Sequence, residues 1–482
     1  MSHRIQEKGD EKSLHIAPML DVSNREFRQL FRILSNRCVL WTEMVVDETI
    51  MFTNDVELHL GYDHPNHEDF EITTQQPIIC QIGGNTPEYA AFATKLVEQF
   101  GYQEINLNVD CPSARVSGKR EFGAVLMKKV DTALAMIQAM KEHVTNIPIS
   151  VKCRVGVDEN DDLEYVVEFI ERLQPYCTKF YIHARKCILG GLLTPAQNRK
   201  VPPLNYPRVY QLCRRFPQCE FWINGGIPTG SLRAAKELCY GVQTWLVNSE
   251  DGIVSAHSEH RVPCQICNHP NGSCVAPLSK SNVPPNLRGC MIGRAAMENP
   301  SLFWDIDRYF YDLSSSPCRN RREVLDRYLH FIECTYPRRC CDNDPRKTVN
   351  IPSPNVIFHS QHCFICQEFF VNPEQIIPKQ MRLSLASTNC RELKISSRVI
   401  DRSLKPILGI FFGLPKSKTF RRVCDQLSRD QKVRNCGPAY IIKKALTSVP
   451  AYILDEDFIR TEETLPKDVP IGRRPQNDPC SL

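Results

Sequence analysis

The segment Glu104-Ile-Asn-Leu-Asn-Val-Asp-Cys-Pro-Ser113 decides the fold. It begins as an alternating run, in which Asn106 and Asn108 lie between aliphatic residues, and this pattern is typical of a buried strand. The run ends at Cys111-Pro112, where the proline stops strand pairing and turns the chain into a loop. A strand that carries two amides and a cysteine to its C-terminal end is typical of one side of an active site. A buried structural cysteine is the alternative, because free cysteines are commonly buried.

Seven further segments have the same character, and amphipathic segments separate them. The eight expected strands span residues 15–19, 38–45, 77–83, 104–110, 149–156, 180–186, 220–227 and 289–294. Between them, apolar residues recur at helical spacing, for example over residues 24–34, 87–100 and 163–173. Alternating strands and helices imply a parallel sheet, and eight such units fit an α/β fold of the closed (β/α)8 TIM-barrel type better than an open sheet.

In such a barrel the chemistry lies at the C-terminal ends of the strands. All eight expected ends carry polar residues or glycines. They are Pro18, Met19, Glu43, Gln81, Asn108, Cys111, Lys152, Arg154, His183, Arg185, Asn224, Gly225, Gly226, Gly293 and Arg294. This coincidence at eight strand ends favours an active site over a purely structural role for Cys111.

Glycines at the ends of the last two expected strands suit a phosphate group. In TIM barrels the loops after strands seven and eight commonly bind phosphate. Gly225 and Gly226 allow close approach of the backbone, and Arg294 adds a cation. A phosphate there would place the rest of a cofactor over the barrel mouth, where Lys152 and Gln81 would meet its ring system. No G-x-G-x-x-G motif follows any expected strand, so no dedicated dinucleotide site is expected.

The composition is ordinary for a globular protein, with 482 residues, 42% hydrophobic and 24% charged residues and a formal net charge of +5. No apolar run approaches the roughly 20 residues that a membrane span needs. The charged residues 1–12 lack the apolar region of a signal peptide. We therefore expect a cytoplasmic protein with no membrane partner, whose cysteines are thiols or ligands rather than disulfides.

The chain divides into three expected regions. Residues 1–300 would form the barrel, residues 301–450 a helical domain, and residues 451–482 a disordered tail. Two irregular insertions, at about 242–287 and about 340–395, are longer than ordinary connections.

The first insertion contains Cys264-x2-Cys267-x-His269-x4-Cys274, which has residue types suited to zinc. Its spacing matches no common zinc module, and we expect no metal. The insertion would enter the eighth strand at its N-terminal end, away from the chemistry.

The expected helical domain is basic. Lysines and arginines crowd residues 416–444, where the acids are Asp425 and Asp430. Lys418 and Arg421 are three residues apart, so on a helix they share a face and can contact phosphates. A solvated basic face without a ligand is the alternative.

A series of longer motifs follows the order of the expected strands. They are His15-Ile-Ala-Pro-Met-Leu-Asp21, Thr42-Glu43-Met44, Gln81-Ile-Gly-Gly84, Ile105-Asn-Leu-Asn-Val-Asp-Cys-Pro-Ser113, Phe122-Gly-Ala-Val-Leu-Met127, Val151-Lys-Cys-Arg154, Ile182-His-Ala-Arg-Lys186, Asn224-Gly-Gly-Ile227 and Met291-Ile-Gly-Arg294. Together they resemble the tRNA-dihydrouridine synthases. The segments Pro202-Pro-Leu-Asn-Tyr-Pro-Arg-Val-Tyr210 and Lys405-Pro-Ile-Leu-Gly-Ile-Phe-Phe-Gly413 are similar to signatures of the 20/20a branch of that family.

The resemblance implies a barrel that binds FMN, NADPH as the reductant of the flavin, and a helical domain that binds tRNA. Hydride would pass from N5 of FMN to C6 of a D-loop uracil, and Cys111 would protonate C5. The uridine would have to be extruded into the pocket. The implied FMN-binding residues are Pro18, Met19, Leu20, Gln81, Lys152, His183, Asn224, Gly225, Gly226, Gly293 and Arg294. The implied tRNA-binding residues are Asn108, as the amide that orients the base, and Arg199, Lys418 and Arg421.

One position departs from the family pattern. The residue before the cysteine is usually glycine in the family, and here it is Asp110. If that position requires a positive φ, an aspartate is strained there. A carboxylate close to Cys111 would also raise the pKa of the thiol.

We therefore expect an FMN- and NADPH-dependent enzyme that reduces uridines in the tRNA D-loop to 5,6-dihydrouridine. One alternative is another FMN barrel oxidoreductase acting on a small pyrimidine, although a small substrate needs no basic helical domain. The other is a tRNA-binding module with impaired catalysis, if Asp110 or the insertions have spoiled the site.

Overall fold

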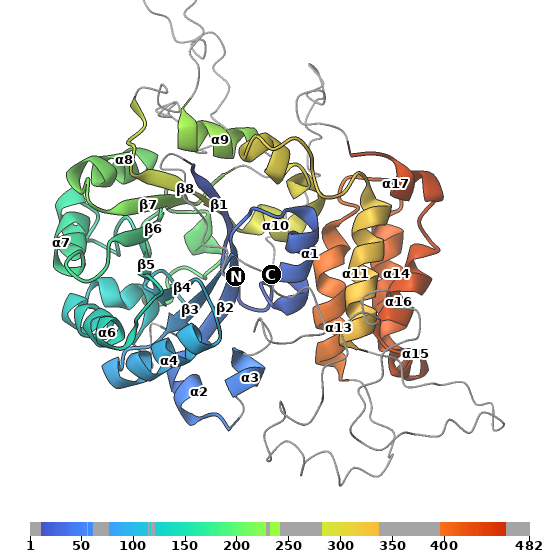
Figure 1. Ribbon diagram of the computed structural model, residues 1–482, viewed down its shortest axis with the longest axis horizontal. Helices are drawn as coiled ribbons and strands as arrows, with labels where there is room; N and C mark the ends of the chain where they lie inside the picture. The colour runs from blue at the N-terminus through green and yellow to red at the C-terminus, as the bar shows by residue number, and fades with distance from the viewer. Residues whose placement is uncertain are drawn as a thin grey trace, which may run out of the picture.

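The computed structural model describes residues 11–54, 56–60, 77–113, 116, 121–227, 232–241, 282–336 and 396–458. Eight parallel strands form its sheet (Figure 1). They are β1 (Ser13–Ile16), β2 (Leu40–Val46), β3 (Ile78–Gly83), β4 (Glu104–Asn108), β5 (Ile149–Arg154), β6 (Lys179–His183), β7 (Glu220–Asn224) and β8 (Leu287–Ile292). Their hydrogen-bonded order is β1-β8-β7-β6-β5-β4-β3-β2. A parallel bridge between His15 and Val39 joins the two ends of the sheet, so the predicted TIM barrel is confirmed.

Helices surround the strands, as the alternating pattern predicts. The barrel helices are α1 (Arg25–Leu34), α2 (Asp47–Phe52), α3 (Val56–His59), α4 (Pro87–Gln99), α6 (Val130–His143), α7 (Leu163–Leu173), α8 (Tyr206–Arg215), α9 (Leu232–Tyr240) and α10 (Arg294–Glu298). Helix α1 begins at Asn24, whose side chain accepts a hydrogen bond from the Phe27 N–H at 3.1 Å, which is a typical N-cap. The buried Phe27, Leu30 and Phe31 then recur at helical spacing.

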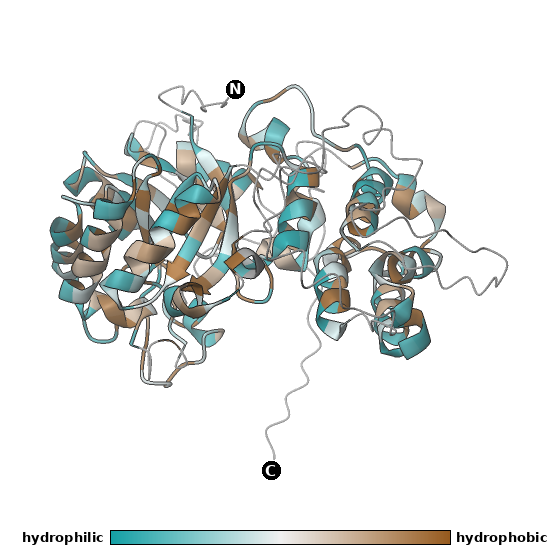
Figure 2. Ribbon diagram, turned by 60° about the horizontal axis from the view of Figure 1, so that its bottom comes forward, coloured by the Kyte–Doolittle hydropathy of each residue, from teal (hydrophilic) through white to brown (hydrophobic). Residues whose placement is uncertain are grey.

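Strand β4 illustrates how the sequence pattern becomes structure. Ile105 and Leu107 are fully buried in the core cluster that also contains Ala93 of α4 and Met136 of α6. Asn106 and Asn108 alternate with them and hydrogen-bond to neighbouring strands instead. Figure 2 shows the same division across the fold, with hydrophobic residues gathered along the strands and mixed polarity on the surrounding helices.

Aromatic side chains fill the barrel interior on the N-terminal side of the strand ends. The rings of Tyr181 and Trp222 stack with centroids 4.6 Å apart, and Trp41 meets Tyr181 edge-on at 4.7 Å. The indole N–H of Trp41 donates to Nδ1 of His15 at 3.1 Å. This packed layer closes the barrel below the strand ends that carry the predicted chemistry.

A second group of helices lies beside the barrel (Figure 1). It contains α11 (Arg321–Thr335), α13 (Ser397–Leu404), α14 (Ser417–Arg429), α15 (Gln431–Asn435), α16 (Pro438–Leu446) and α17 (Ala451–Asp455). Their buried residues form a separate core cluster that also includes Leu30 and Leu34 of α1. The buried Glu26 of α1 accepts hydrogen bonds from the Tyr336 hydroxyl at 2.5 Å and from Arg402 Nε at 3.2 Å. Helix α1 is therefore shared between the barrel and the helical group.

The segment that connects the barrel to the helical group packs partly in the barrel core. Phe303 and Phe310, from the short turns Pro300–Phe303 and Ile306–Phe310, pack in the barrel cluster. A domain boundary near residue 300 stays a prediction.

The prediction of a disordered tail from residue 451 is wrong for its first residues. They form α17, whose Ile453 and Leu454 are buried in the helical cluster. Arg322 of α11 also forms an ion pair with Asp455. The apolar residues after Pro450 form a helix face that packs against the helical cluster. The prediction gave more weight to the acidic residues of the segment than to this apolar run. The rest of the tail (459–482) and most of both insertions (242–281 and 337–395, including Cys264, Cys267, His269 and Cys274) lie outside the described residues.

The cysteines in the described ranges are free thiols, and most of them are buried. Within the same ranges, no helix has both the length and the apolar character needed to cross a membrane.

Candidate active site

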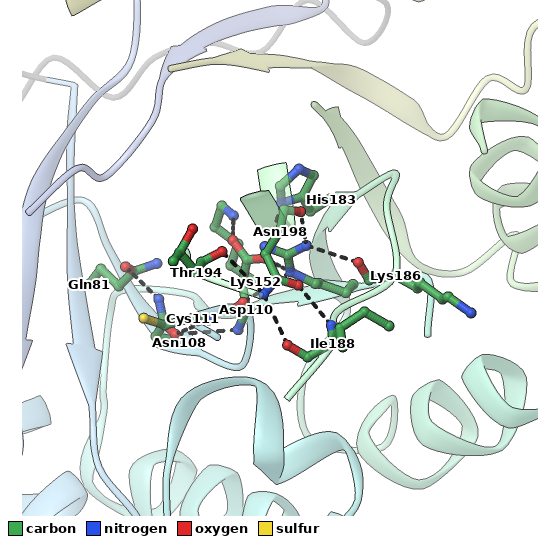
Figure 3. Close-up of polar contacts among 11 residues, drawn as sticks. Gln81, Asn108, Asp110, Cys111, Lys152, His183, Lys186, Ile188, Thr194 and Asn198 are labelled. Carbon is green, nitrogen blue, oxygen red and sulfur yellow. Dashed lines mark hydrogen bonds and ion pairs between the residues drawn. The ribbon is translucent and has the colours of Figure 1, made fainter. Parts of the chain in front are cut away.

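The C-terminal ends of β3, β4, β5 and β6 bring five of the predicted site residues together. Gln81, Asn108, Lys152 and His183 are buried, and Cys111 lies partly exposed just after β4 (Figure 3). They form a layer of side chains near the strand ends, in which the register of the sheet places Asn108 beside Lys152 and His183 beside Arg154.

Hydrogen bonds fix the orientation of both amides in this layer. Asn108 Nδ2 donates to Gln81 Oε1 at 2.9 Å, and Gln81 Nε2 donates to Asn106 Oδ1 at 2.8 Å. The Asn108 oxygen accepts from the Cys111 N–H at 3.1 Å and from the Asp110 N–H at 3.3 Å. The amide of Asn108 therefore connects a predicted cofactor ligand to the predicted proton donor.

The chain of hydrogen bonds continues toward the other end of the barrel. Asn106 Nδ2 donates to Ser150 Oγ at 2.8 Å, and Ser150 Oγ donates to Glu104 Oε1 at 2.6 Å. The Tyr181 hydroxyl also donates to Glu104, at 2.9 Å, and Lys179 lies 3.4 Å from its other oxygen. Sequence reasoning did not find this chain, because it joins residues of β3, β4, β5 and β6 that are distant along the sequence.

A second loop holds Cys111 in place. The Ala124 N–H donates to the Cys111 carbonyl at 3.0 Å. Gly123 has a φ of +74°, and a Cβ there would lie 2.7 Å from the same carbonyl, so this position requires glycine. Burial, and in addition the charge of Asp110, raise the pKa of the Cys111 thiol above its ordinary value. The thiol therefore keeps its proton at neutral pH.

Asp110 lies between two cations and an imidazole. Its carboxylate forms an ion pair with Lys152, contacts Arg154 Nε at 2.6 Å and contacts His183 Nδ1 at 3.1 Å. Burial raises the pKa of Asp110, but the charges of Lys152 and Arg154, together with the hydrogen bond from His183, outweigh burial and hold that pKa well below its ordinary range. The backbone of Asp110 is not among the described residues with a positive φ, so the expected left-handed strain does not arise.

His183 is neutral at pH 7. Burial, and then the charge of Arg154, lower the pKa of its imidazole to about 3. Since the ionised carboxylate of Asp110 can only accept, the proton of the neutral ring lies on Nδ1, and Nε2 is left as an acceptor. Gly225, with a φ of +104°, allows this packing, because a Cβ there would lie 2.7 Å from His183 Cδ2.

The ends of β7 and β8 form the predicted phosphate corner. Asn224 Nδ2 donates to the Met291 carbonyl at 2.8 Å and joins the two strands. Gly226 has a φ of +63° and approaches Leu204 so closely that a Cβ would lie 2.1 Å from it. Gly293 follows β8, and Arg294 Nη2 donates to the Arg199 carbonyl at 3.2 Å. The corner thus brings a predicted FMN ligand and a predicted tRNA ligand together.

The guanidinium groups at this corner fit an anion such as a phosphate. Nε of Arg185 and Nε of Arg199 are buried with no hydrogen-bond partner. Burial, together with the neighbouring charges of Arg294 and Arg154, lowers the pKa of both side chains. Nη1 of Arg185 donates to the carbonyls of Lys200 and Pro202, but the two Nε donors lack acceptors. Buried guanidinium donors of this kind are suited to a ligand with several anionic oxygens. Arg154 and Arg185 lie at predicted strand ends, but neither is among the residues predicted to bind FMN or tRNA.

Asn198 is a further residue that the sequence did not single out. It is fully buried, accepts from the Ile188 N–H at 2.7 Å and donates to the Ile188 and Leu193 carbonyls at 3.0 and 3.1 Å. Arg154 Nη1 donates to its carbonyl at 3.2 Å. Asn198 therefore anchors the loop after β6 that carries Arg199. An asparagine in a loop of this sequence offers no signal of such a role.

The end of β1 borders the same opening. Met19 Sδ lies 3.6 Å from the position of a Cβ on Gly293, so β1 and β8 end side by side. Pro18 is half-buried, while Leu20 is 68% exposed. An exposed leucine at the mouth of a barrel is available to cover a ligand.

Lys418 and Arg421 lie on α14 in the helical group and not with Asn108 and Arg199 at the barrel mouth (Figure 1). Both are exposed, and Arg421 Nε donates to the Leu408 carbonyl at 2.9 Å. No carboxylate in the described part of the chain forms an ion pair with either residue. By contrast, Arg429 pairs with Asp425 at 2.9 Å.

Comparisons with known proteins agree with this geometry. The model of the dihydrouridine synthase (Dus) family matches residues 15–243. A tRNA-dihydrouridine(20/20a) synthase of Haemophilus ducreyi is 36% identical, over 66% of this chain and 79% of its own length. Proteins of the same name from Vibrio cholerae and Yersinia pestis are 35% and 36% identical, over 66% of this chain and 80% and 75% of their own lengths. The chain therefore belongs to the dihydrouridine synthase family.

Proposed function

We propose that this protein is an FMN- and NADPH-dependent enzyme that reduces uridine in tRNA to 5,6-dihydrouridine. The observation that carries the proposal is the position of Cys111 after β4, where its N–H donates to Asn108, whose amide also bonds to Gln81 and which pairs with Lys152 across the sheet. The relatives named tRNA-dihydrouridine(20/20a) synthases support the choice of tRNA as substrate. Because the substrate is tRNA, we propose that the enzyme works in the cytoplasm.

The residues at the barrel mouth suit FMN. Gly225, Gly226, Gly293 and Arg294 would hold its phosphate, beside the guanidinium donors without partners. Gln81, Lys152 and His183 would meet its ring system. Pro18, Met19, Leu20 and Asn224 would border it. FMN, when bound and reduced by NADPH, would supply the hydride that adds to C6 of the uracil.

Cys111 would supply the proton that C5 of the uracil takes up. Its raised pKa keeps the thiol protonated until the substrate needs the proton, as a general acid requires. Asn108 would hold the loop of Cys111 in position and orient the base. The uridine would have to leave the stack of the D-loop to reach this pocket.

Two surfaces would bind the tRNA backbone. Arg199 would contact it at the barrel mouth, and Lys418 and Arg421 would contact it on α14. The exposed positions of Lys418 and Arg421, without carboxylate partners in the described ranges, support a polyanionic substrate. They also disfavour the alternative of an oxidoreductase for a small pyrimidine, which needs no such surface.

The test is reduction of an unmodified tRNA transcript by the purified protein with FMN and NADPH. We expect dihydrouridine in the transcript and no reduction of free uridine, and we expect Cys111→Ala to form dihydrouridine at least about a hundredfold more slowly at the same flavin content. Equal reduction of free uridine would overturn the assignment in favour of a small substrate. A flavin that NADPH reduces but that no tRNA reoxidises would overturn the proposed activity.

A further inference from the structure

A carboxylate of the chain lies against the groups that would meet the flavin ring. Asp110 forms an ion pair with Lys152 and contacts His183 Nδ1 at 3.1 Å. All three side chains are shielded from solvent, with exposed fractions of 15% for Asp110, 4% for Lys152 and 7% for His183. The contacts are therefore weakly screened by water.

This arrangement changes what Lys152 and His183 offer to a ligand. A lysine that faces a carboxylate presents less net positive charge to a ligand oxygen than an unpaired lysine does. The Nδ1–H of His183 is already donated to Asp110, and Nε2 can only accept. The same carboxylate also contacts Arg154 Nε at 2.6 Å, so two cations share one negative charge. This side of the site therefore offers less positive charge to an anion or to a carbonyl oxygen of the flavin ring than it would without Asp110.

We propose that Asp110 tunes the flavin site: its carboxylate, shared between Lys152 and Arg154, reduces the positive charge of the site and fixes the tautomer of His183, so that it weakens FMN binding and lowers the reduction potential of bound FMN. The inference rests on the proposed function, since it presumes that FMN binds at this mouth. FMN carries an anionic phosphate and gains negative charge on its ring when it is reduced. A nearby carboxylate opposes both binding and reduction.

A structural role for Asp110 gives a different expectation. Arg154 is held without Asp110, because its Nη1 donates to the carbonyls of Lys186 and Asn198, each at 3.2 Å. Lys152 loses its ion-pair partner when the carboxylate is removed, so the flavin-free protein loses stability. If Asp110 only stabilised the fold, its removal would lower the melting temperature and leave or weaken FMN affinity. The proposal instead requires lower stability together with tighter FMN binding.

The test compares FMN affinity of the full-length flavin-free protein by fluorescence titration. We expect Asp110→Asn and Asp110→Gly to bind FMN about tenfold more tightly than the wild type. We also expect a higher midpoint potential for FMN bound to the variants. Asp161→Asn is the matched control, because Asp161 also pairs with two cations, Lys186 and Arg208, but not with Lys152 or His183. Its FMN affinity should equal that of the wild type.

A double variant keeps the test decisive if Asp110→Asn and Asp110→Gly fold poorly. In the double variant Lys152→Met, Asp110→Asn, no lysine is left without a partner, and FMN should bind more tightly than in Lys152→Met alone. Equal or weaker FMN binding after loss of Asp110, in either background, would overturn the inference while leaving the proposed function intact. Failure of the wild type and of every variant to bind FMN would instead overturn the proposed function.

Discussion

The side-chain oxygen of Asn108 accepts a hydrogen bond from the backbone N–H of Cys111 at 3.1 Å. The nitrogen of the same amide donates to Gln81 at 2.9 Å. The position of the thiol is thereby coupled to the orientation of a residue that would face the flavin. Such coupling fixes the proton donor relative to the cofactor, which a reaction on two adjacent carbons of a base requires.

Asn106 should be essential for the stability of the hydrogen-bond chain behind the site. Asn106→Leu leaves Gln81 Nε2 without its buried acceptor and removes the donor to Ser150 Oγ, which keeps its bond to Glu104. An unsatisfied buried polar group costs about 1–3 kcal/mol. We expect a decrease of that size in the free energy of unfolding, measured in urea. Gln218→Leu, at an exposed position, is the control and should change it by less than about 0.5 kcal/mol. Equal stability of Asn106→Leu and the wild type would contradict the account.

Lys152→Met should weaken FMN binding. The substitution removes the buried cation and leaves the carboxylate of Asp110 facing the ligand with less compensation. The dissociation constant, measured by fluorescence titration, should rise by about tenfold or more. Lys128→Met provides the comparison and should leave FMN affinity unchanged, because Lys128 pairs with Asp158 and Glu159 and not with Asp110. An unchanged FMN affinity in Lys152→Met would remove Lys152 from the site.

Binding of tRNA should depend steeply on salt, and α14 should carry part of that dependence. Each phosphate contact contributes about 0.7–0.9 to the slope of log K against log salt concentration. Lys418→Ala and Arg421→Ala should each lower the slope by about that amount. Arg429→Ala should change it little, because Arg429 is paired with Asp425. Equal slopes in all three variants and the wild type would place the tRNA elsewhere.

The pH dependence of the oxidative half-reaction should report the thiol. The pKa of Cys111 is raised, so the proton donor is present through neutral pH and is lost only above the ordinary range of thiols. The rate of flavin reoxidation by tRNA should therefore be flat near pH 7 and fall at alkaline pH. Because the charge of Asp110 contributes to the raised pKa, Asp110→Asn should move this fall to lower pH. A stopped-flow profile that falls already from pH 6 to 8 in the wild type would exclude the thiol as the acid.

Much of the fold follows from patterns within short segments. The alternation that begins at Glu104 and the helical spacing in Leu163–Leu173 each depend on local neighbours. The helix has the predicted bounds, and the strand, predicted over residues 104–110, ends at Asn108. The ion pairs of Asp110 depend on side chains from β5 and β6, which no local pattern connects. For the same reason the sequence predicted strain at Asp110 but not its contacts with Lys152, Arg154 and His183. Asn198 anchors its loop through contacts with Ile188 and Leu193, which form only when the loop folds back on itself. The sequence therefore did not predict this role either.

The most direct test of the central claim is Cys111→Ala in the two half-reactions, followed by stopped flow. The account predicts normal FMN content, normal reduction of the flavin by NADPH and near-normal tRNA affinity. Reoxidation of the flavin by tRNA should slow by about a hundredfold to ten-thousandfold, as expected for loss of a general acid. Unimpaired reoxidation by tRNA in Cys111→Ala would contradict the assignment of Cys111 as the proton donor.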